Sequence, residues 1–251
     1  MTENEIDKNW FASTFDDLYP LIYAHRTVES AAPESEFAVQ QLAIGPNDRV
    51  LDLCCGAGRH LYHLARHTPH VFGLDYSAQL LATAKTALAG KGLLVRGDMR
   101  HLPFENAFDA VTNFFTSFGY FLDSRENHAV VEGVARALRP GGRFFIDYLN
   151  AEYVETHLQS SSDRTIDGMR IVEERWIDRE RDRVNKLTVV FRDNTEITRA
   201  MESVRLYTES EMRFLLEGCG LTVERVFGCY SGLAFSADTP RLILIGRKTG
   251  A

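Results

Sequence analysis

Residues 50–60 read Val-Leu-Asp-Leu-Cys-Cys-Gly-Ala-Gly-Arg-His, a short apolar run that leads into a glycine turn. The apolar run predicts a buried strand, and apolar residues recur at helical spacing after the turn. Glycines let the backbone approach a ligand closely, and the first turn of a helix presents unpaired N–H groups at the positive end of its dipole. The motif therefore predicts a site for a nucleotide-like ligand, although a glycine turn alone can also serve a purely conformational purpose.

Short apolar runs and helical stretches alternate on both sides of this motif. Such alternation is typical of βαβ units, which build a parallel sheet with helices on its faces. Arg-Pro-Gly-Gly at 139–142 is expected to end one helix and to lead into the next strand. The expected strands lie at 49–55, 70–75, 93–98, 108–115, 143–150, 222–230 and 239–248.

Residues 151–207 interrupt this alternation. Apolar and charged residues interleave there in three segments, which favours extended strands. We expect an antiparallel β cap inserted into a core that comprises residues 43–150 and 208–251. Periodicity does not decide whether Glu202, Arg205 and Tyr207 of this insertion face the cleft. The three expected strands lie at 169–178, 183–193 and 197–207.

The N-terminal segment, residues 1–42, has a mainly helical pattern from residue 10 onward, with aromatic side chains at steps of three and four. Pro20 marks a break or the start of a second helix. We expect this segment to form an N-terminal helical lid. The alternative is an amphipathic helix that packs on the sheet.

Acidic residues lie in or at the ends of three successive expected strands, namely Asp52, Asp75 and Asp98. Asp75 follows Gly58 by seventeen positions, where a βαβ nucleotide site places a carboxylate against ribose hydroxyls. Met99 follows Asp98 and has a polarizable side chain suited to one face of an adenine ring. Because parallel strands end at one edge of their sheet, these side chains are expected to converge there.

Taken together, the motifs resemble those of the class I S-adenosylmethionine-dependent methyltransferases over residues 40–150 and 208–251. The resemblance implies a Rossmann-like α/β fold, with a seven-stranded, mostly parallel sheet, helices on both faces and an antiparallel last strand. It also implies S-adenosylmethionine as cofactor and S-adenosylhomocysteine as product. At Cys54 the family most often has glycine, and the substitution is mild if the backbone there is extended. The motifs are VLDLCCGAGR (50–59), GLDYS (73–77), GDMRHLPF (97–104), FDAV (108–111) and LRPGGR (138–143).

The resemblance also assigns candidate residues to parts of the cofactor. The methionine part is assigned to Asp52, Gly56 and Gly58, the ribose to Asp75, the adenine to Asp98 and Met99, and the transferred methyl group to Asn113 and Phe114. Tyr76 is a further cofactor-binding candidate with no part of the cofactor assigned to it. The N-terminal segment resembles the lid of small-molecule N-methyltransferases, in which a Tyr and an Arg hold the cofactor carboxylate. The candidates for that role are Tyr19, Tyr23 and Arg26. No catalytic base is assigned, and the candidate catalytic residues are Tyr120 and Asn113.

Composition narrows the choice of partners. The net charge of −7 opposes a phosphate backbone, so we expect no nucleic-acid partner. The first ten residues are polar and no apolar run reaches ~18 residues, so we expect a cytoplasmic protein without a membrane partner. The four cysteines form no C-x-x-C pair. His60, His63, His67 and His70 could share a helix face and bind a metal, but we favour plain helix packing and expect no metal.

We therefore expect a methyltransferase that acts on a small molecule. An amine is the favoured acceptor, because an amine need only be delivered neutral whereas a hydroxyl needs a base or a metal. The alternatives are O- or C-methylation of a small metabolite, and a non-catalytic protein that binds S-adenosylmethionine. A nicotinamide-dependent dehydrogenase is disfavoured because Leu61 replaces the third glycine of G-x-G-x-x-G. The sequence assigns neither the acceptor nor the oligomeric state.

Overall fold

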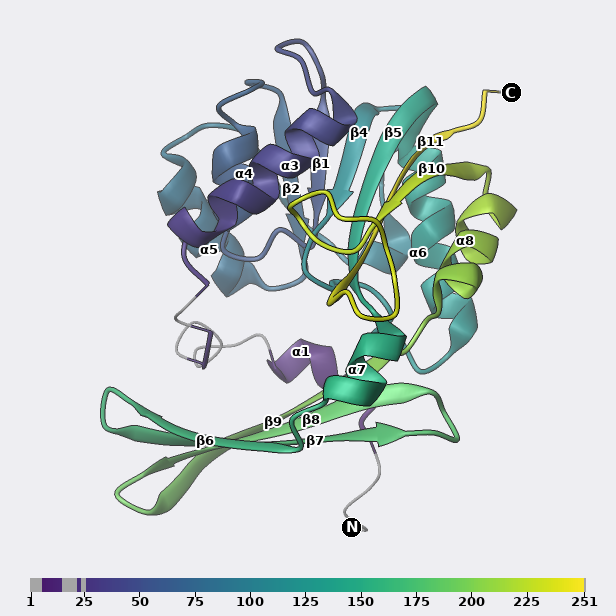
Figure 1. Ribbon diagram of the computed structural model, residues 1–251. Helices are drawn as coiled ribbons and strands as arrows, with labels where there is room; N and C mark the ends of the chain where they lie inside the picture. Colours follow the sequence, from purple (N-terminus) through teal and green to yellow (C-terminus); the bar gives the residue numbers. More distant parts are fainter. Residues whose placement is uncertain (1–5, 15–21, 24–25, 251) are drawn as a thin grey trace.

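The computed structural model describes residues 6–14, 22–23 and 26–250 (Figure 1). Its core is a seven-stranded sheet in the order β3-β2-β1-β4-β5-β11-β10. All neighbouring strands pair in parallel except β11, which runs antiparallel to both β5 and β10. This confirms the expected sheet and its antiparallel last strand. The strands are β1 (Val50–Leu53), β2 (Val71–Asp75), β3 (Leu93–Arg96), β4 (Phe108–Asn113), β5 (Leu138–Leu149), β10 (Leu221–Phe227) and β11 (Arg241–Lys248).

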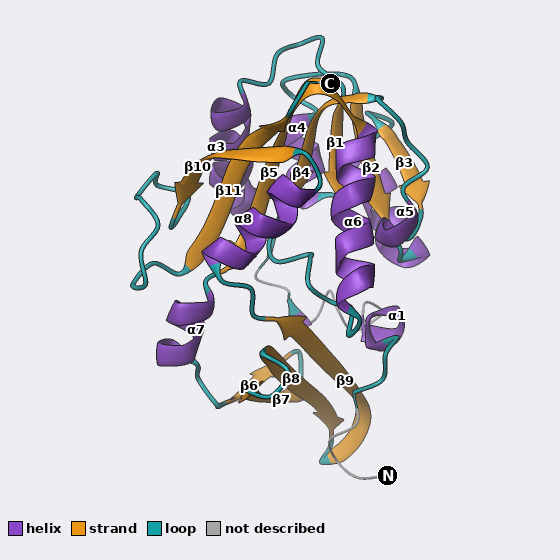
Figure 2. Ribbon diagram, turned by 90° about the vertical axis from the view of Figure 1, so that its right-hand side faces the viewer, coloured by secondary structure: helices purple, strands orange, loops and turns teal. Residues whose placement is uncertain are grey.

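Helices cover both faces of this sheet (Figures 1 and 2). Each face carries its own apolar cluster, and β5 shows why: Phe144 and Ile146 belong to one cluster and Phe145 to the other. Alternate residues of a strand point to opposite faces, so a strand buried on both sides is apolar throughout. One face holds α3 (Ala32–Leu42), α4 (Arg59–Leu64) and α5 (Ala78–Leu88), and the other holds α6 (Ser124–Ala137) and α8 (Glu209–Gly218).

The inserted residues form a second, antiparallel sheet in the order β6-β7-β8-β9. It lies across the carboxyl-terminal end of the core strands, as Figure 1 shows. The sequence predicted three of its strands but neither β6, which is a polar edge strand with alternating exposure, nor the short helix α7 that precedes it. The elements are α7 (Ala151–His157), β6 (Ser161–Ile166), β7 (Met169–Asp178), β8 (Arg183–Arg192) and β9 (Thr195–Arg205).

Helix α1 (Trp10–Thr14) of the N-terminal segment lies between the core and the cap sheet (Figure 1). It packs on β9, where the Thr14 hydroxyl donates to the carbonyl of Met201 at 2.9 Å. Further along, η1 (Glu29–Ala31) leads into α3. Tyr19 lies outside the described residues, and the role of the segment as a lid stays a prediction. Among the described residues, no helix combines the length and the apolar character needed to cross a membrane.

Two glycines offer a test of how tightly the core is packed. A Cβ at Gly246 in β11 would lie 1.9 Å from the carbonyl oxygen of Thr222 and 2.8 Å from the Phe144 ring, whereas a Cβ at Gly218 would meet nothing within 4 Å. Gly246→Ala should therefore destabilise the protein by at least about 2 kcal/mol. Gly218→Ala, its matched control at the end of α8, should be neutral or stabilise by up to ~1 kcal/mol. Thermal unfolding measures both, and equal melting temperatures for the two variants would contradict the packing described.

Candidate functional site

Two adjoining cavities lie at the carboxyl-terminal ends of the core strands. The wide cavity, of about 440 Å³, lies between the core and the cap sheet, and the narrow cavity, of about 90 Å³, lies beside β2 and β3. The loop of residues 114–121, which follows β4, contributes to both linings. The residues common to both linings are Cys54, Gly56, Leu80, Ser117 and Tyr120.

The narrow cavity brings together the residues that the sequence assigned to ribose and adenine. Its lining includes Asp75, Tyr76, Asp98 and Met99, together with Phe11, which the sequence analysis did not single out. Two carboxylates beside aromatic and thioether side chains suit a ligand that joins hydroxyls to a flat apolar ring.

Backbone N–H groups hold the carboxylate of Asp75 in place. Its two oxygens accept hydrogen bonds from Gly56 N at 2.8 Å and from Ser77 N at 2.9 Å, so the end of β1 is tied to the start of α5. Burial raises the pKa of Asp75, although these N–H donors act in the opposite direction. Asp98 instead pairs with Arg100 at 2.6 Å.

The glycine turn serves both the cavities and the packing of helices. Gly56 has a left-handed backbone (φ +53°) and lines both cavities. Gly58 also has positive φ, but it lies outside both linings, and a Cβ there would come within 3.0 Å of Ala84 Cβ in α5. The condition for a mild substitution at Cys54 is not met: its backbone is left-handed (φ +60°) and not extended, which costs on the order of 1 kcal/mol for a non-glycine residue.

Two thiols lie in the site. Cys54 lines both cavities and Cys55 lines the wide one. Burial, reinforced by the carboxylates of Asp75 and Asp52, raises the pKa of both thiols well above its usual range. Both cysteines are therefore protonated at neutral pH.

Asp52 is buried and lies outside both linings. Its Oδ1 accepts a hydrogen bond from the Thr112 hydroxyl at 3.0 Å, whereas Oδ2 has no partner. Burial raises the pKa of Asp52 to about 7, against the lowering effect of the Thr112 hydrogen bond. The position of Asp52 next to the turn fits its predicted role near the cofactor, but direct contact stays a prediction.

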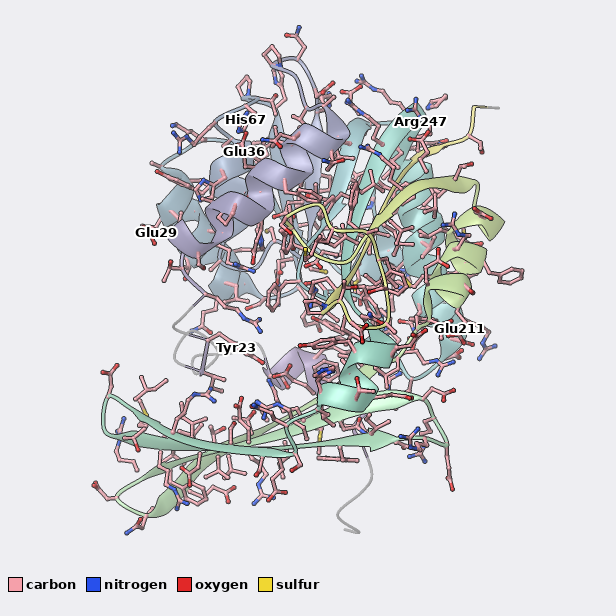
Figure 3. The ribbon with its side chains drawn as sticks, viewed as in Figure 1. Tyr23, Glu29, Glu36, His67, Glu211 and Arg247 are labelled. Atoms are coloured by element: carbon pink, nitrogen blue, oxygen red, sulfur yellow. The ribbon has the colours of Figure 1, made fainter. Side chains whose placement is uncertain are left out.

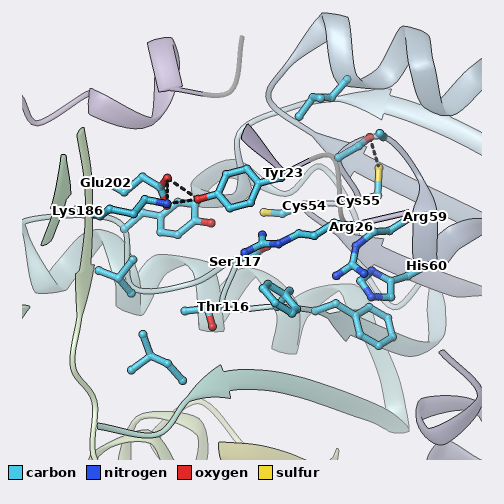
Figure 4. Close-up of a pocket in the computed structure, with 18 of the residues that line it drawn as sticks. Tyr23, Arg26, Cys54, Cys55, Arg59, His60, Thr116, Ser117, Lys186 and Glu202 are labelled. Carbon is cyan, nitrogen blue, oxygen red and sulfur yellow. Dashed lines mark hydrogen bonds and ion pairs between the residues drawn. The ribbon is translucent and has the colours of Figure 1, made fainter. Parts of the chain in front are cut away.

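Arg26 enters the wide cavity between two aromatic rings. Its Cζ lies 4.0 Å from the ring centroid of Tyr23 and 4.0 Å from that of Phe115, which fixes the plane of the guanidinium. Its Nε is buried without a hydrogen-bond partner. Figure 4 shows Arg26 near the centre of this site, with Arg59 and His60 at one side. An anion with two oxygens would satisfy such a group.

Charge at the wide cavity is predominantly positive. Among the described residues, four of its five lining cations have a carboxylate partner, and Arg26 has none. Glu202 carries the one carboxylate among the described lining residues. The five cations are Arg26, Arg59, Arg175, Lys186 and Arg241.

Glu202 belongs to a group of three polar side chains at the side of the wide cavity that the cap sheet lines, drawn in Figure 4. The Tyr23 hydroxyl donates to Glu202 Oε1 at 2.6 Å, and Lys186 Nζ pairs with the same oxygen at 2.6 Å and also donates to Tyr23. Tyr23 thus projects from the N-terminal segment towards the cap sheet, as Figure 3 also shows. Arg205 and Tyr207, which the sequence left open beside Glu202, line a different cavity.

The two candidate catalytic residues, one at the end of β4 and one in the loop that follows it, differ in position. Tyr120 lines both cavities. Asn113 is buried outside both linings, where its Nδ2 donates to the carbonyls of Leu53 and Ser117 at 3.0 and 3.2 Å. Asn113 therefore supports the loop, and Phe114 lines the wide cavity. A catalytic role for either candidate stays a prediction.

The histidines of the region after the glycine turn have separate partners. His60 stacks on Phe114 with ring centroids 4.0 Å apart, and its Nε2 lies 2.6 Å from Glu34. Burial lowers the pKa of His60 to about 4, so its imidazole is neutral at neutral pH. His63 contacts the carbonyl of Val28, and His67 pairs with Glu36 at the outer surface (Figure 3). Within the described ranges, no group of three or more His, Cys, Asp or Glu side chains could hold a metal.

The chain is similar to known methyltransferases. Residues 50–142 match the family model of a methyltransferase domain. A dTDP-3-amino-3,4,6-trideoxy-alpha-D-glucopyranose N,N-dimethyltransferase from Streptomyces venezuelae is 35% identical over 127 residues, which are 50% of this chain and 53% of that protein. The match thus spans about half the length of that relative.

Two longer matches extend the likeness to nearly the whole chain. A dTDP-3-amino-3,6-dideoxy-alpha-D-glucopyranose N,N-dimethyltransferase from Streptomyces fradiae is 27% identical, with 92% of each chain covered. The crystal structure of an S-adenosylmethionine-dependent methyltransferase from Clostridium acetobutylicum superposes with a TM-score of 0.78 at 23% identity, over 96% of this chain and 99% of that chain. The structural match includes the cap as well as the core.

The raised pKa of Asp52 predicts how one substitution changes stability with pH. The folded-state pKa of about 7 exceeds the ordinary value of 3.8, so the stability that Asp52 contributes is present at low pH and is lost as the pH rises to about 7. The stability of Asp52→Asn relative to the native protein should therefore grow by about 2–3 kcal/mol between pH 5 and pH 8. Thermal unfolding of the ligand-free proteins at both values tests this. A difference that is constant or that shrinks with pH would refute the buried, unpaired carboxylate.

Arg26 offers a second test, which separates the parts of the expected cofactor. If Arg26 holds the carboxylate, Arg26→Ala should weaken S-adenosylmethionine and S-adenosylhomocysteine by roughly 10- to 100-fold and leave adenosine nearly unchanged. Arg26→Lys should recover only part of the loss, because it keeps the charge but not the planar group between the rings. Calorimetric titration measures all three ligands. Equal losses for all of them would indicate a general disturbance, and no loss would exclude the contact.

Proposed function

Because the chain belongs to the class I S-adenosylmethionine-dependent methyltransferases, we propose that it transfers the methyl group to an amine of a small molecule. The observation that carries this proposal is the wide cavity, which is enclosed by core and cap and carries Glu202 as its one carboxylate among the described lining residues.

The residues that line the two cavities are chemically suited to the parts of the cofactor that the family uses. The narrow cavity would hold the adenosine part, with Asp75 at the ribose and Met99 at the adenine. Gly56 lies where the two cavities meet, and the nearest atom to a Cβ there would be 3.9 Å away, so the turn is open towards a ligand. Arg26 would receive the carboxylate of the methionine part. When bound, S-adenosylmethionine supplies a methyl group on a positively charged sulfur.

The size of the wide cavity and the net charge of the chain support a small acceptor. A volume of about 440 Å³ falls within the usual range for small-molecule sites. The acidic chain, with a net charge of −7, gives no electrostatic attraction for a nucleic acid. We propose that the cap covers the acceptor side of the site and that the N-terminal segment closes it.

Glu202 is the group that we assign to the acceptor nitrogen. An amine attacks only when its lone pair is free, so a carboxylate that accepts one of its protons favours the reactive form. Lys186 and Tyr23 fix the position of this carboxylate through bonds of 2.6 Å each to its Oε1. The aromatic rings of Phe114, Phe115 and Tyr120 make part of the lining apolar. Alignment of the reactants can lower the barrier by roughly 7–11 kcal/mol.

The names of the relatives support an amine over other nucleophiles. Both sugar enzymes in the comparison are N,N-dimethyltransferases whose named compounds carry a 3-amino group. An amino sugar, free or attached to a nucleotide, is therefore the first class of acceptor to assay.

The test combines product analysis with one substitution. The protein is incubated with methyl-labelled S-adenosylmethionine and matched pairs of small amines and alcohols, and products are identified by mass spectrometry. We expect N-methyl products, and we expect Glu202→Gln to lower kcat/KM for the amine by about 10- to 100-fold, with cofactor affinity changed less than about twofold. Glu174→Gln, at an exposed position of the same sheet, is the matched control and should behave like the native protein.

Other outcomes would decide against the proposal. Products methylated on oxygen or carbon would show that the acceptor nucleophile is not an amine. Cofactor binding without transfer to any acceptor would favour the non-catalytic alternative.

A further inference from the structure

Arg183, the first residue of β8, is a buried cation with an unusual set of partners. Its side chain is 3% exposed, and no ion pair with a carboxylate is found for it among the described residues. Its guanidinium donates to backbone carbonyls of three consecutive residues of the core: to Gly119 at 3.1 Å, Tyr120 at 2.9 Å and Phe121 at 3.0 Å. Its remaining bonds, to the hydroxyl and carbonyl of Ser203, anchor it within the cap sheet.

These three carbonyls belong to the loop that shapes both cavities. Tyr120 lines the wide and the narrow cavity, and Phe121 lines the narrow one. The adjacent strand β9 adds a further bond to the loop, from Arg205 N to the carbonyl of Gly119 at 2.9 Å. Hydrogen bonds therefore join the cap sheet to the part of the core loop that lines the two cavities.

Burying a guanidinium without a carboxylate partner is unfavourable unless its N–H groups are satisfied by other acceptors. Burial lowers the pKa of Arg183 to about 10, so the group keeps its charge at neutral pH. A charged donor holds carbonyl oxygens more strongly than a neutral one. The arrangement suits a group that fixes the position of a loop with no regular backbone pairing of its own.

We propose that Arg183 is a positioning residue through which the cap sheet sets the affinity of the cofactor site. By holding residues 119–121, it fixes the rings of Tyr120 and Phe121 against the narrow cavity. The inserted cap is then required for cofactor binding as well as for covering the acceptor. This inference rests on the proposed placement of adenosine in the narrow cavity, but not on the identity of the acceptor.

Trp10 supplies a spectroscopic probe of the same loop. Its indole N–H donates to the carbonyl of Tyr120 at 3.3 Å, and the two rings lie 5.0 Å apart between centroids. The chain contains two tryptophans, so a Trp176→Phe background leaves Trp10 as the single indole emitter. Emission from Trp10 therefore reports directly on whether the loop keeps its place.

The experiment compares Arg183→Met, Arg183→Lys and Arg192→Met in that background. Arg192 is exposed at the other end of β8 and serves as the control. Arg183→Met should weaken both S-adenosylhomocysteine and adenosine by at least tenfold in calorimetric titration, shift Trp10 emission to longer wavelength and make it more accessible to acrylamide. Arg183→Lys should give affinities and Trp10 emission between those of Arg183→Met and the background protein, because an ammonium can donate hydrogen bonds to some but not all of the carbonyls. Arg192→Met should match the background protein.

A merely structural role would give a different result. If Arg183→Met lowers the melting temperature but leaves both affinities and the Trp10 emission of the folded protein unchanged, the proposal is overturned. If that variant does not fold, Ser203→Ala provides the second test, since it removes the acceptor of the 2.7 Å bond from Arg183 Nε. It should weaken adenosine and S-adenosylhomocysteine together by a few-fold, and unchanged affinities would overturn the proposal.

The affinities measured for the variants also distinguish this inference from the proposed function. Loss of adenosine affinity distinguishes an effect at Arg183 from one at Arg26, where adenosine binding should be retained. The chemical class of the methylated product plays no part in either measurement, so an acceptor other than an amine would leave the inference on Arg183 intact.

Discussion

Both cavities depend on the loop of residues 114–121, whose backbone does not hold its conformation by local preference. Phe115 and Thr116 are left-handed, with φ values of +57° and +63°, which costs on the order of 1 kcal/mol or more at each residue. The buried carboxylate of Asp147 in β5 compensates from the core side: it accepts from Phe115 N at 2.8 Å and pairs with Arg241 at 2.7 Å. From the cap side, Arg183 donates hydrogen bonds to the other end of the same loop, at residues 119–121. Two buried charges on opposite sides therefore maintain the shape of the site.

Much of the fold could be predicted from the sequence because its signals are local. Apolar runs that end in Gly or Asp, separated by helical stretches, indicated the core strands, and residues 50–60 indicated where a ligand approaches the sheet. The elements of the inserted cap were harder to predict from the sequence. Strand β6 (SSDRTI) has a single large apolar residue and lies at a sheet edge, and α7 is too short for helical periodicity to identify. The left-handed backbone of Cys54 could not be predicted, because it arises from the turn as a whole and not from its own side chain.

Some of the site residues could also be predicted from local sequence signals, and others could not. Asp75, Tyr76, Asp98 and Met99 share one cavity because they lie at or just after the ends of β2 and β3, which end at the same edge of the sheet. The order of the strands alone predicts this relation. Asp52 and Gly58, from the same motif, lie outside the linings, since alternation along a strand and helix packing decide where those residues face. Lys186 and Arg183 meet Tyr23 and Tyr120 across sequence separations of 163 and 63 residues. No periodicity encodes such contacts, because they depend on how the inserted sheet docks on the core.

The two adjacent thiols have a consequence for the lifetime of the enzyme. A thiolate is a strong nucleophile, and an electrophilic methyl donor held beside one would alkylate the protein itself. Cys54 and Cys55 lie in the lining of the cavities, yet burial and the surrounding carboxylates keep their sulfur atoms protonated. The carboxylates of Asp75 and Asp52 thus keep the two thiols unreactive. If the cavities hold a sulfonium donor as proposed, the site would tolerate two sulfur nucleophiles in its lining.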